Sequence, residues 1–120
     1  MIPKFRAWDK RRQRMIEVTS INFRDGNIQE ETRYAVNREL YLDDVVLMQY
    51  TGLKDQEGTE IYEGDVVNYF VKSNSIIEWK NGGFIIKRVI DGAYELIQSR
   101  IAEIEVLGNI YENPELLEGE

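Results

Sequence analysis

The stretch LMQYTGLKDQEGTEIYEGDVV, residues 47–67, decides the fold of this 120-residue chain. Apolar and β-branched residues that favour strands stand at both of its ends, and three glycines punctuate the polar segment between them. Turns are expected at Thr51-Gly52 and Glu57-Gly58. All three glycines, Gly64 included, are expected where the backbone needs a positive φ or a close approach. The stretch therefore predicts strands joined by tight turns, and it contains no recognisable catalytic template.

Alternating apolar and polar residues recur on both sides of this stretch, as expected of half-buried strands. The pattern predicts a strand over residues 45–50 and another over 66–71, followed by a loop at 72–74, whereas residues 37–42 fit either a short helix or a strand. Three further segments carry the residues that hairpin turns favour: Asp25-Gly26-Asn27, Asn81-Gly82-Gly83 and Asp91-Gly92.

Near the C-terminus, Asn113 is a favourable N-cap residue and Pro114 stands at a first helical position, which predicts a short helix through Leu117. Short strands separated by glycine turns predict a mainly β fold, all-β or α+β with little helix. We expect an antiparallel barrel-like or sandwich-like small domain with a short C-terminal helix. The chain length predicts a single domain over residues 1–120.

Cysteine and histidine are both missing from the chain. The absence of Cys excludes disulfides, thiolate chemistry and Cys-based zinc or iron–sulfur sites. The absence of His excludes imidazole general bases, Ser-His-Asp triads and most transition-metal sites. We therefore expect no enzyme and no cofactor. A hydrolase that uses carboxylates and a cation such as magnesium is the alternative from that class.

The apolar runs of the chain, such as residues 45–48, are far too short to span a bilayer. Residues 1–4 carry charge without an apolar segment behind them, which predicts no secretory signal. We expect a cytoplasmic protein with no membrane partner.

Basic residues are concentrated in the first 14 residues, where six of them stand against Asp9 alone, a net charge of +5, so that the rest of the chain carries −12. One interpretation is a charged, solvated turn between two strands. A second is a nucleic-acid contact, and a third is docking on the acidic body of a second subunit. The residues that would make a nucleic-acid or partner contact are Lys4, Arg6, Trp8, Lys10, Arg11, Arg12 and Arg14, with Trp8 stacking on a base.

The carboxylates of the central stretch allow two interpretations. Asp55 and Asp65 are suited to accept hydrogen bonds from turn amides. Alternatively, a hard cation would be held by Asp55, Glu57, Glu60, Glu63 and Asp65 together, although their spacing lacks the order of a calcium loop. The aromatic residues also allow two interpretations. Tyr50, Tyr62 and Trp79 belong to the core in one interpretation and form a platform for single-stranded nucleic acid in the other.

Three blocks of the chain resemble the pattern of the YopX-type proteins: residues 5–9, residues 48–67 and residues 108–117. The resemblance implies a mostly β protein encoded by phages, prophages and related mobile elements of Gram-positive bacteria. It implies no reaction, cofactor or catalytic residue. The signature positions, for which we expect structural roles, are Gln49, Tyr50, Thr51, Gly52, Leu53, Asp55, Gly58, Ile61, Tyr62, Gly64, Asp65, Gly108, Asn109, Tyr111, Asn113 and Pro114.

The prediction that follows is a protein of unknown function that acts as a non-enzymatic accessory or interaction protein in the cytoplasm of a bacterial host cell. Its expected partners are a second copy of the chain, giving a homo-oligomer, or a phage or host protein. A nucleic-acid-binding module that uses the basic N-terminal arm is the alternative, and the cation-dependent hydrolase is the third candidate.

Overall fold

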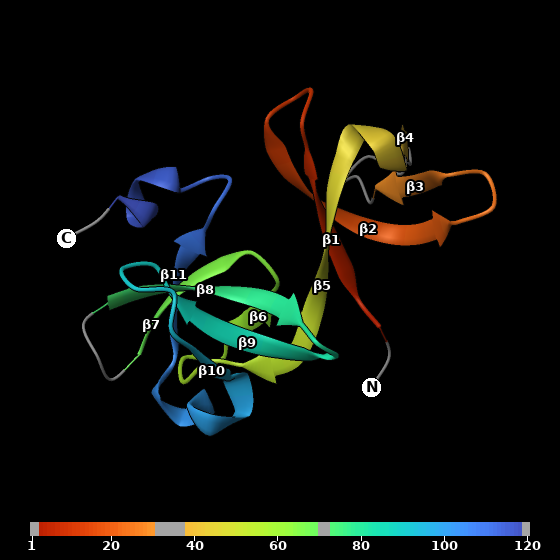
Figure 1. Cartoon of the computed structure of the whole chain (residues 1–120). Helices are drawn as coiled ribbons and strands as arrows, with labels where there is room; N and C mark the ends of the chain where they lie inside the picture. Colours follow the sequence, from red (N-terminus) through yellow and green to blue (C-terminus); the bar gives the residue numbers. More distant parts are fainter. Residues whose placement is uncertain (1–2, 31–37, 70–72, 119–120) are drawn as a thin grey trace. The chain divides into compact units, whose positions relative to one another are not determined.

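The computed structural model describes residues 3–30, 38–69 and 73–118, and strands dominate it (Figure 1). The helical elements are single 3-10 turns: η1 (Leu42–Asp44), η2 (Ile97–Ser99), η3 (Ile101–Glu103) and η4 (Pro114–Leu117). The strands are β1 (Phe5–Asp9), β2 (Arg14–Asn22), β3 (Asn27–Glu30), β4 (Arg38–Tyr41), β5 (Val45–Lys54), β6 (Glu60–Tyr62), β7 (Asp65–Tyr69), β8 (Ser73–Lys80), β9 (Gly83–Arg88), β10 (Tyr94–Leu96) and β11 (Glu105–Asn109).

The strands form two antiparallel sheets, ordered β4-β3-β2-β1-β5-β6 and β10-β9-β8-β7-β11. The prediction of a mainly β fold is therefore confirmed, and two antiparallel sheets fit its sandwich-like form. The barrel-like form is wrong. A barrel requires every strand to pair on both sides, whereas β4, β6, β10 and β11 each pair on one side among the described residues.

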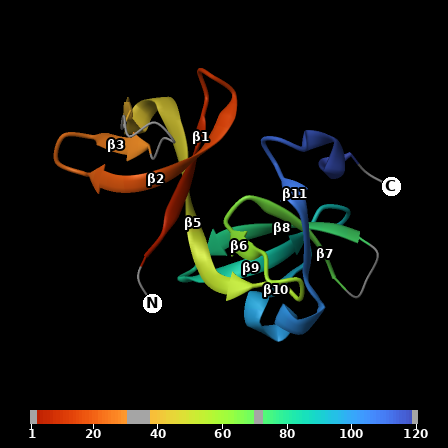
Figure 2. The same ribbon diagram turned by 180° about the vertical axis from the view of Figure 1, so that it is seen from behind.

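The chain divides into two compact units, residues 2–49 and residues 50–120. Strand β5 belongs to both, because its first half pairs with β1 and its second half pairs with β6 (Figures 1 and 2). The single domain expected from the chain length stays a prediction.

The N-terminal unit is built on β1, which pairs with β2 on one side and β5 on the other. The turn expected at residues 25–27 is present: Gly26 adopts a φ of +72°, and the side chain of Asn22 accepts a hydrogen bond from the Asp25 amide at 3.0 Å. The described part of residues 37–42 forms strand β4 and the start of η1, and residue 37 lies outside the described residues. The core cluster consists of Ala7, Ile16, Ile28, Leu40 and Val45.

The C-terminal unit buries one face of its five-stranded sheet. Both predicted hairpin turns on this sheet are present: Asn81 and Gly82 adopt φ values of +51° and +85°, and Gly92 adopts +73°. Positive φ at both central residues is the requirement of the type I′ turn that Asn-Gly favours. The core consists of Ile61, Val67, Tyr69, Ile77, Ile86, Ile97 and Ile104.

Three predicted boundaries are wrong. The strand expected to end at Tyr50 continues to Lys54, because Gly52 adopts a φ of +86° and makes a bulge rather than the expected turn; the register against β6 shifts there. The expected loop at 72–74 is also wrong for Ser73 and Asn74, which pair with β7, while residue 72 lies outside the described residues. The strand expected over 66–71 begins at Asp65 and is described as far as Tyr69, since residues 70 and 71 lie outside the described range.

The predicted C-terminal helix is a 3-10 turn of four residues, η4. Asn113 does not cap it, because the Asn113 Oδ1 atom accepts a hydrogen bond from the Asn109 amide at 3.1 Å instead. Pro114 still starts the turn, as expected for a residue that has no amide hydrogen to leave unpaired. The side chain that was expected to cap the helix therefore accepts a hydrogen bond within the preceding turn instead.

Candidate functional site

Asp55 is a buried carboxylate that joins the β5–β6 loop to β11. Its Oδ1 atom accepts hydrogen bonds from the amides of Glu57 and Thr59, both at 2.9 Å, and its Oδ2 atom accepts one from the Val106 amide at 2.9 Å. Burial raises the pKa of Asp55, but these backbone donors outweigh it and hold the pKa below its usual value. The carboxylate is committed to structure within the C-terminal unit.

Asp65 has a similar role at the next turn, where its Oδ2 atom accepts a hydrogen bond from the Tyr62 amide at 2.8 Å. These are the turn-amide hydrogen bonds that the sequence predicts for Asp55 and Asp65. Gly58 and Gly64 adopt φ values of +86° and +84°, and the Gly64 amide donates to the carbonyl of Ile77 at 2.8 Å. Positive φ therefore accounts for both glycines, whereas a Cβ atom at Gly58 would meet open space.

The cation-site interpretation has no geometry to support it. All five acidic residues proposed for it lie within the described residues, where no group of three or more carboxylates is placed to hold a metal ion. The oxygens of Asp55 face backbone amides instead. The five carboxylates proposed for a cation are therefore not gathered into one site in the part of the chain that the structure describes.

The C-terminal signature block is a turn held by two asparagines. Asn109 Oδ1 accepts hydrogen bonds from the amides of Tyr111 and Glu112 at 3.0 and 2.8 Å, and its Nδ2 atom donates to Glu112 Oε1 at 2.8 Å. A Cβ atom on Gly108 would lie 2.6 Å from Cγ of Asn113, so only glycine fits beside that side chain. The side chains of these two asparagines therefore shape the turn.

The remaining signature residues also have structural positions. Tyr62 is buried, and its ring centroid lies 5.4 Å from that of the half-buried Tyr50. The buried Thr51 donates its hydroxyl to the Ile61 carbonyl at 2.7 Å across the β5–β6 pair. Gln49 lies opposite Phe5 in the β1–β5 ladder, Ile61 is fully buried, Leu53 packs against the core, and Pro114 starts η4.

The basic N-terminal arm is the β1–β2 hairpin. Its loop is closed by Asp9, whose Oδ1 atom accepts from the amides of Arg11 and Arg12 at 3.0 and 3.1 Å, while Arg12 Nη1 lies 3.3 Å from Oδ2. Burial raises the pKa of Asp9, but the hydrogen bonds from Arg12 and Arg11 outweigh it and leave the pKa below its usual value. This is the charged turn between two strands that the sequence predicts.

Two of the proposed nucleic-acid contacts are occupied elsewhere. Trp8 is 7% exposed and belongs to the packed interior, so its ring is not available to stack on a base. Arg14 makes a bidentate pair with the buried Glu30, both at 2.6 Å. Lys4 and Arg6 lie at the start of the chain, Lys4 exposed and Arg6 half-buried, while Lys10, Arg11 and Arg12 are exposed on the loop.

The aromatic residues do not form one platform. Tyr62 belongs to the interior with Tyr50 against it, whereas Trp79 is 53% exposed and meets Phe84 edge-on with ring centroids 4.9 Å apart. Trp79 and Phe84 are cross-strand partners on the core side of the sheet, at its open end beside the Asn81-Gly82 turn.

Sequence reasoning missed the opposite side of the five-stranded sheet. Side chains alternate along β8, and the register of β8, β9 and β10 places one set of residues on the side away from the core. On this side Tyr94 and Leu96 are 52% and 57% exposed, although both are large apolar residues. We call the β8–β10 part of this side the outer face; it consists of Ile76, Glu78, Lys80, Ile85, Lys87, Tyr94 and Leu96, of which Ile85 is buried. On β7, β8 and β11 the same side of the sheet also carries Val66, Asn68, Asn74 and Glu105.

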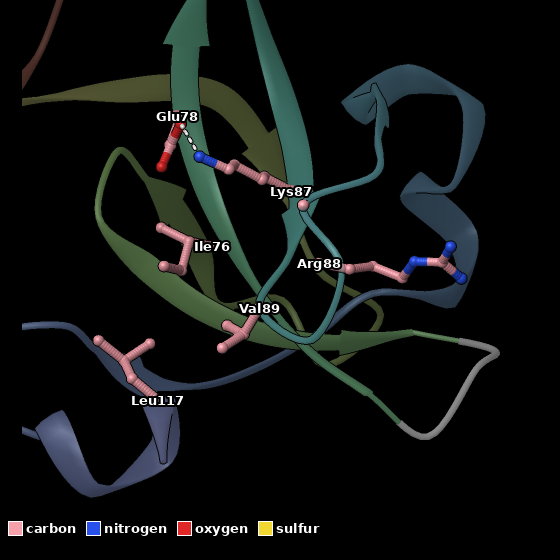
Figure 3. Close-up of a pocket in the computed structure, with 7 residues that line it drawn as sticks. Ile76, Glu78, Lys87, Arg88, Val89 and Leu117 are labelled. Atoms are coloured by element: carbon pink, nitrogen blue, oxygen red, sulfur yellow. Dashed lines mark ion pairs between the residues drawn. The ribbon is translucent and has the colours of Figure 1, made fainter. Parts of the chain in front are cut away.

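A pocket of about 250 Å³ opens on the outer face (Figure 3). Ile76, Val89 and Leu117 form its apolar wall, while Lys87 reaches toward Glu78, with Nζ and Oε1 4.0 Å apart. Arg88 points away and pairs with Asp91 at 2.8 Å.

Leu117 reaches this pocket through η4, which the Asn74 side chain anchors by a 2.8 Å hydrogen bond to the Leu116 carbonyl. Alternation in β8 is visible in the sequence. The position of Leu117 beside β8 depends on tertiary structure, so the sequence contains no pattern that predicts it.

A family model described as YopX protein matches residues 4–118. The chain belongs to the YopX family. The resemblance seen in the three sequence blocks is thereby confirmed. Protein EF1440 from Enterococcus faecalis is 31% identical and aligns with a TM-score of 0.68, covering 98% of this chain and 99% of that one.

Protein yopX from Bacillus subtilis is 21% identical, with a TM-score of 0.69 and coverage of 96% and 98%, which is a likeness of fold. No curated protein matches the chain. Within the described residues, none of the helices of this chain has the length and apolar character needed to cross a membrane.

Proposed function

We propose that this YopX-family chain is a non-enzymatic interaction protein that binds another protein through its outer face. The observation that carries the proposal is the combination, on one side of one sheet, of two exposed large apolar residues and an apolar-walled pocket. Exposed apolar surface of this kind beside polar side chains is typical of protein–protein contact sites.

The disposition of the polar groups supports binding over catalysis. The buried carboxylates of Asp9, Asp55 and Asp65 all accept backbone hydrogen bonds, and the chain has no His or Cys. At about 250 Å³ the pocket is also smaller than the roughly 300–1,000 Å³ of most small-molecule sites. It is suited to a single side chain of a partner.

The proposal includes an accessory role in phage or prophage life in the cytoplasm of a Gram-positive host, as the family resemblance implies. It also includes a second copy of the chain as one candidate partner. Residues 2–49 contain nine basic and eight acidic residues, whereas residues 50–120 contain six basic and fourteen acidic residues. Self-association through this charge segregation predicts an oligomer that dissociates at high salt in analytical ultracentrifugation, and a salt-insensitive oligomer would contradict it.

Affinity capture of the tagged chain from a lysate of its natural host, with and without nuclease, tests the proposed function. We expect a defined protein that survives nuclease, is lost with Leu96→Asp and is retained with Phe23→Asp. The second variant is the matched control, because Phe23 is an exposed apolar residue of the N-terminal unit, 74% exposed. Capture of no protein, or capture that nuclease abolishes, would contradict the proposal.

A further inference from the structure

We infer that the outer face takes its partner as an extended segment of another protein, which pairs with the open edge of β10 and continues the five-stranded sheet. This inference rests on the proposed function and specifies how the partner binds. It follows from the hydrogen bonds at the sheet edges, from the backbone of β10 and from the side chains beside it.

Two other edge strands of the C-terminal unit have an outward amide that is occupied by a carboxylate. On β11 the Val106 amide donates to Asp55 Oδ2 at 2.9 Å, and on β6 the Tyr62 amide donates to Asp65 Oδ2 at 2.8 Å. The register of β11 also shifts between Val106 and Gly108. Covered edges and bulges are means by which natural sheets avoid pairing with other chains. β6 and β11 are therefore protected against a further strand.

The edge of β10 is open. Where β9 and β10 begin to pair, the Arg88 amide donates to the Ala93 carbonyl at 2.8 Å, which marks a hydrogen-bonded pair. Bonded and non-bonded pairs alternate along an antiparallel ladder, so Glu95 directs its amide toward β9, whereas Tyr94 and Leu96 direct theirs away from it. No described residue accepts a hydrogen bond from these two outward amides. Both amides and the outward carbonyl of Tyr94 are available to a further strand.

Large apolar side chains stand beside this edge. Tyr94 and Leu96 are 52% and 57% exposed and lie on the outer face. Lys80 Nζ lies 4.4 Å over the centroid of the Tyr94 ring, an interaction that favours one position of the ring. A strand paired with β10 places every second side chain about 5 Å from these two residues. We expect β-branched or aromatic residues at those positions of the partner, because they pack best against such neighbours.

A second copy of the chain fits this edge poorly. Two β10 strands that pair antiparallel through Tyr94 are related by a twofold axis. That axis brings Lys80 of each copy, which lies over its own Tyr94 ring, to the same side of the paired strands. Like charges in that position oppose pairing. A second copy also offers only the three residues of its own β10. The segment therefore belongs to another protein.

Peptides selected from a random library displayed on phage against the full-length chain provide the probe. We expect enrichment of peptides with β-branched or aromatic residues at every second position. Hydrogen exchange followed by NMR then reports on single amides. The amides of Tyr94 and Leu96 should exchange rapidly in the free chain and at least tenfold more slowly with saturating peptide. The Glu95 amide, which is bonded to β9, should exchange slowly in both states.

Leu96→Pro tests the backbone contact directly. Leu96 has a φ of −65°, which is the angle that proline adopts, and its amide faces away from β9. The substitution therefore removes an outward donor and leaves the ladder intact, as expected for proline on an edge strand. Leu96→Ala is the matched control, because it shortens the side chain further than proline does but keeps the amide. Leu96→Pro should bind the selected peptides at least tenfold more weakly than Leu96→Ala.

A variant with the α-hydroxy analogue of leucine at position 96 covers the case in which Leu96→Pro is less stable than Leu96→Ala. The resulting ester lacks the same N–H group and keeps the leucine side chain, so it should weaken peptide binding as Leu96→Pro does.

Equal binding by the proline and alanine variants, protection of the Tyr94 and Leu96 amides in the free chain, or no enriched peptide would overturn the inference. A natural partner captured from lysate by Leu96→Pro as well as by Leu96→Ala would also overturn it, while leaving the proposed function intact. Absence of any captured protein would instead remove the proposed function.

Discussion

The side chain of Asp55 holds the β5–β6 loop together and connects it to β11. Its two oxygens accept three backbone hydrogen bonds, two inside the β5–β6 loop and one from β11, about fifty residues further along the chain. A role in turn geometry was predictable, because Asp is a turn-capping residue. The bond to Val106 was not, since nothing in the local sequence specifies which strand the loop meets.

Replacing Asp55 with Ala should lower the free energy of unfolding by roughly 2–4 kcal/mol, because three amides in a largely buried site lose their acceptor. Urea denaturation followed by circular dichroism measures the change. The control is Glu57→Ala, at an exposed side chain in the same loop, which should stay within about 0.5 kcal/mol of wild type. A stable Asp55→Ala variant would show that water substitutes for the carboxylate.

The lowered pKa values of Asp9 and Asp55 predict the acid response of the protein. Burial raises both pKa values, but the backbone donors outweigh burial, so both lie below the unfolded value of about 3.9. As the pH falls below that value, the unfolded chain binds protons first. The stabilisation is therefore complete above about pH 5, and it is lost as the pH falls through the unfolded value toward the lower folded-state pKa values.

Melting temperatures measured from pH 7 to pH 2 check this prediction. Asp55→Asn should be less stable than wild type at pH 7 and should lose less stability on acidification, so that the two curves converge at low pH. Parallel curves would show that Asp55 does not contribute to the acid response.

At the scale of elements, hairpins were predictable and irregularities were not. Asn81-Gly82 specifies its own turn, because the two residues tolerate the positive φ that a tight hairpin demands. Gly52 has the same tolerance but serves a bulge inside β5, since the strand gains a partner in β6 by continuing. Local chemistry thus identified the unusual backbone, and pairing decided whether it became a turn or a bulge.

The candidate site likewise combines features that the local sequence predicts with features that depend on tertiary structure. Alternation in β8 was visible, yet the pocket depends on Leu117, which η4 brings to the sheet through the hydrogen bond from Asn74 to Leu116. The segment was expected to form a helix capped by Asn113. That side chain instead accepts a hydrogen bond from the Asn109 amide. The sequence alone does not show which backbone amide Asn113 binds.

The Arg14–Glu30 pair links β2 to β3 in the N-terminal unit. Replacing Arg14 with Met should destabilise the protein by roughly 1–3 kcal/mol, because a buried carboxylate loses its bidentate partner, although the 40% exposure of Arg14 softens the effect. The double variant Arg14→Met with Glu30→Met should recover part of the loss. Thermal denaturation of the single and double variants measures this, and additive losses would argue against direct coupling.

At the scale of the whole molecule, β5 is common to both compact units. Unfolding either unit removes a pairing partner from one half of this strand, so we expect a single cooperative transition. Each unit contains one tryptophan, Trp8 in the first and Trp79 in the second. Trp79→Phe and Trp8→Phe therefore give fluorescence probes that report on the two units separately.

Each variant is unfolded in urea and followed by both fluorescence and circular dichroism. In each variant the two signals should give the same free energy of unfolding. A fluorescence transition that departs from the circular dichroism transition in either variant would show that the units unfold independently. The single-domain prediction over residues 1–120 would then be wrong.

The most direct test of the outer face is photo-crosslinking inside the cell that naturally carries the protein. A benzophenone amino acid is placed at Leu96 on the outer face, or at Phe23 as the exposed control in the other unit. The account predicts a discrete crosslinked protein adduct from position 96 upon illumination and none from position 23. Adducts from position 23 alone, or none from either position, would contradict the claim that this face binds a protein partner.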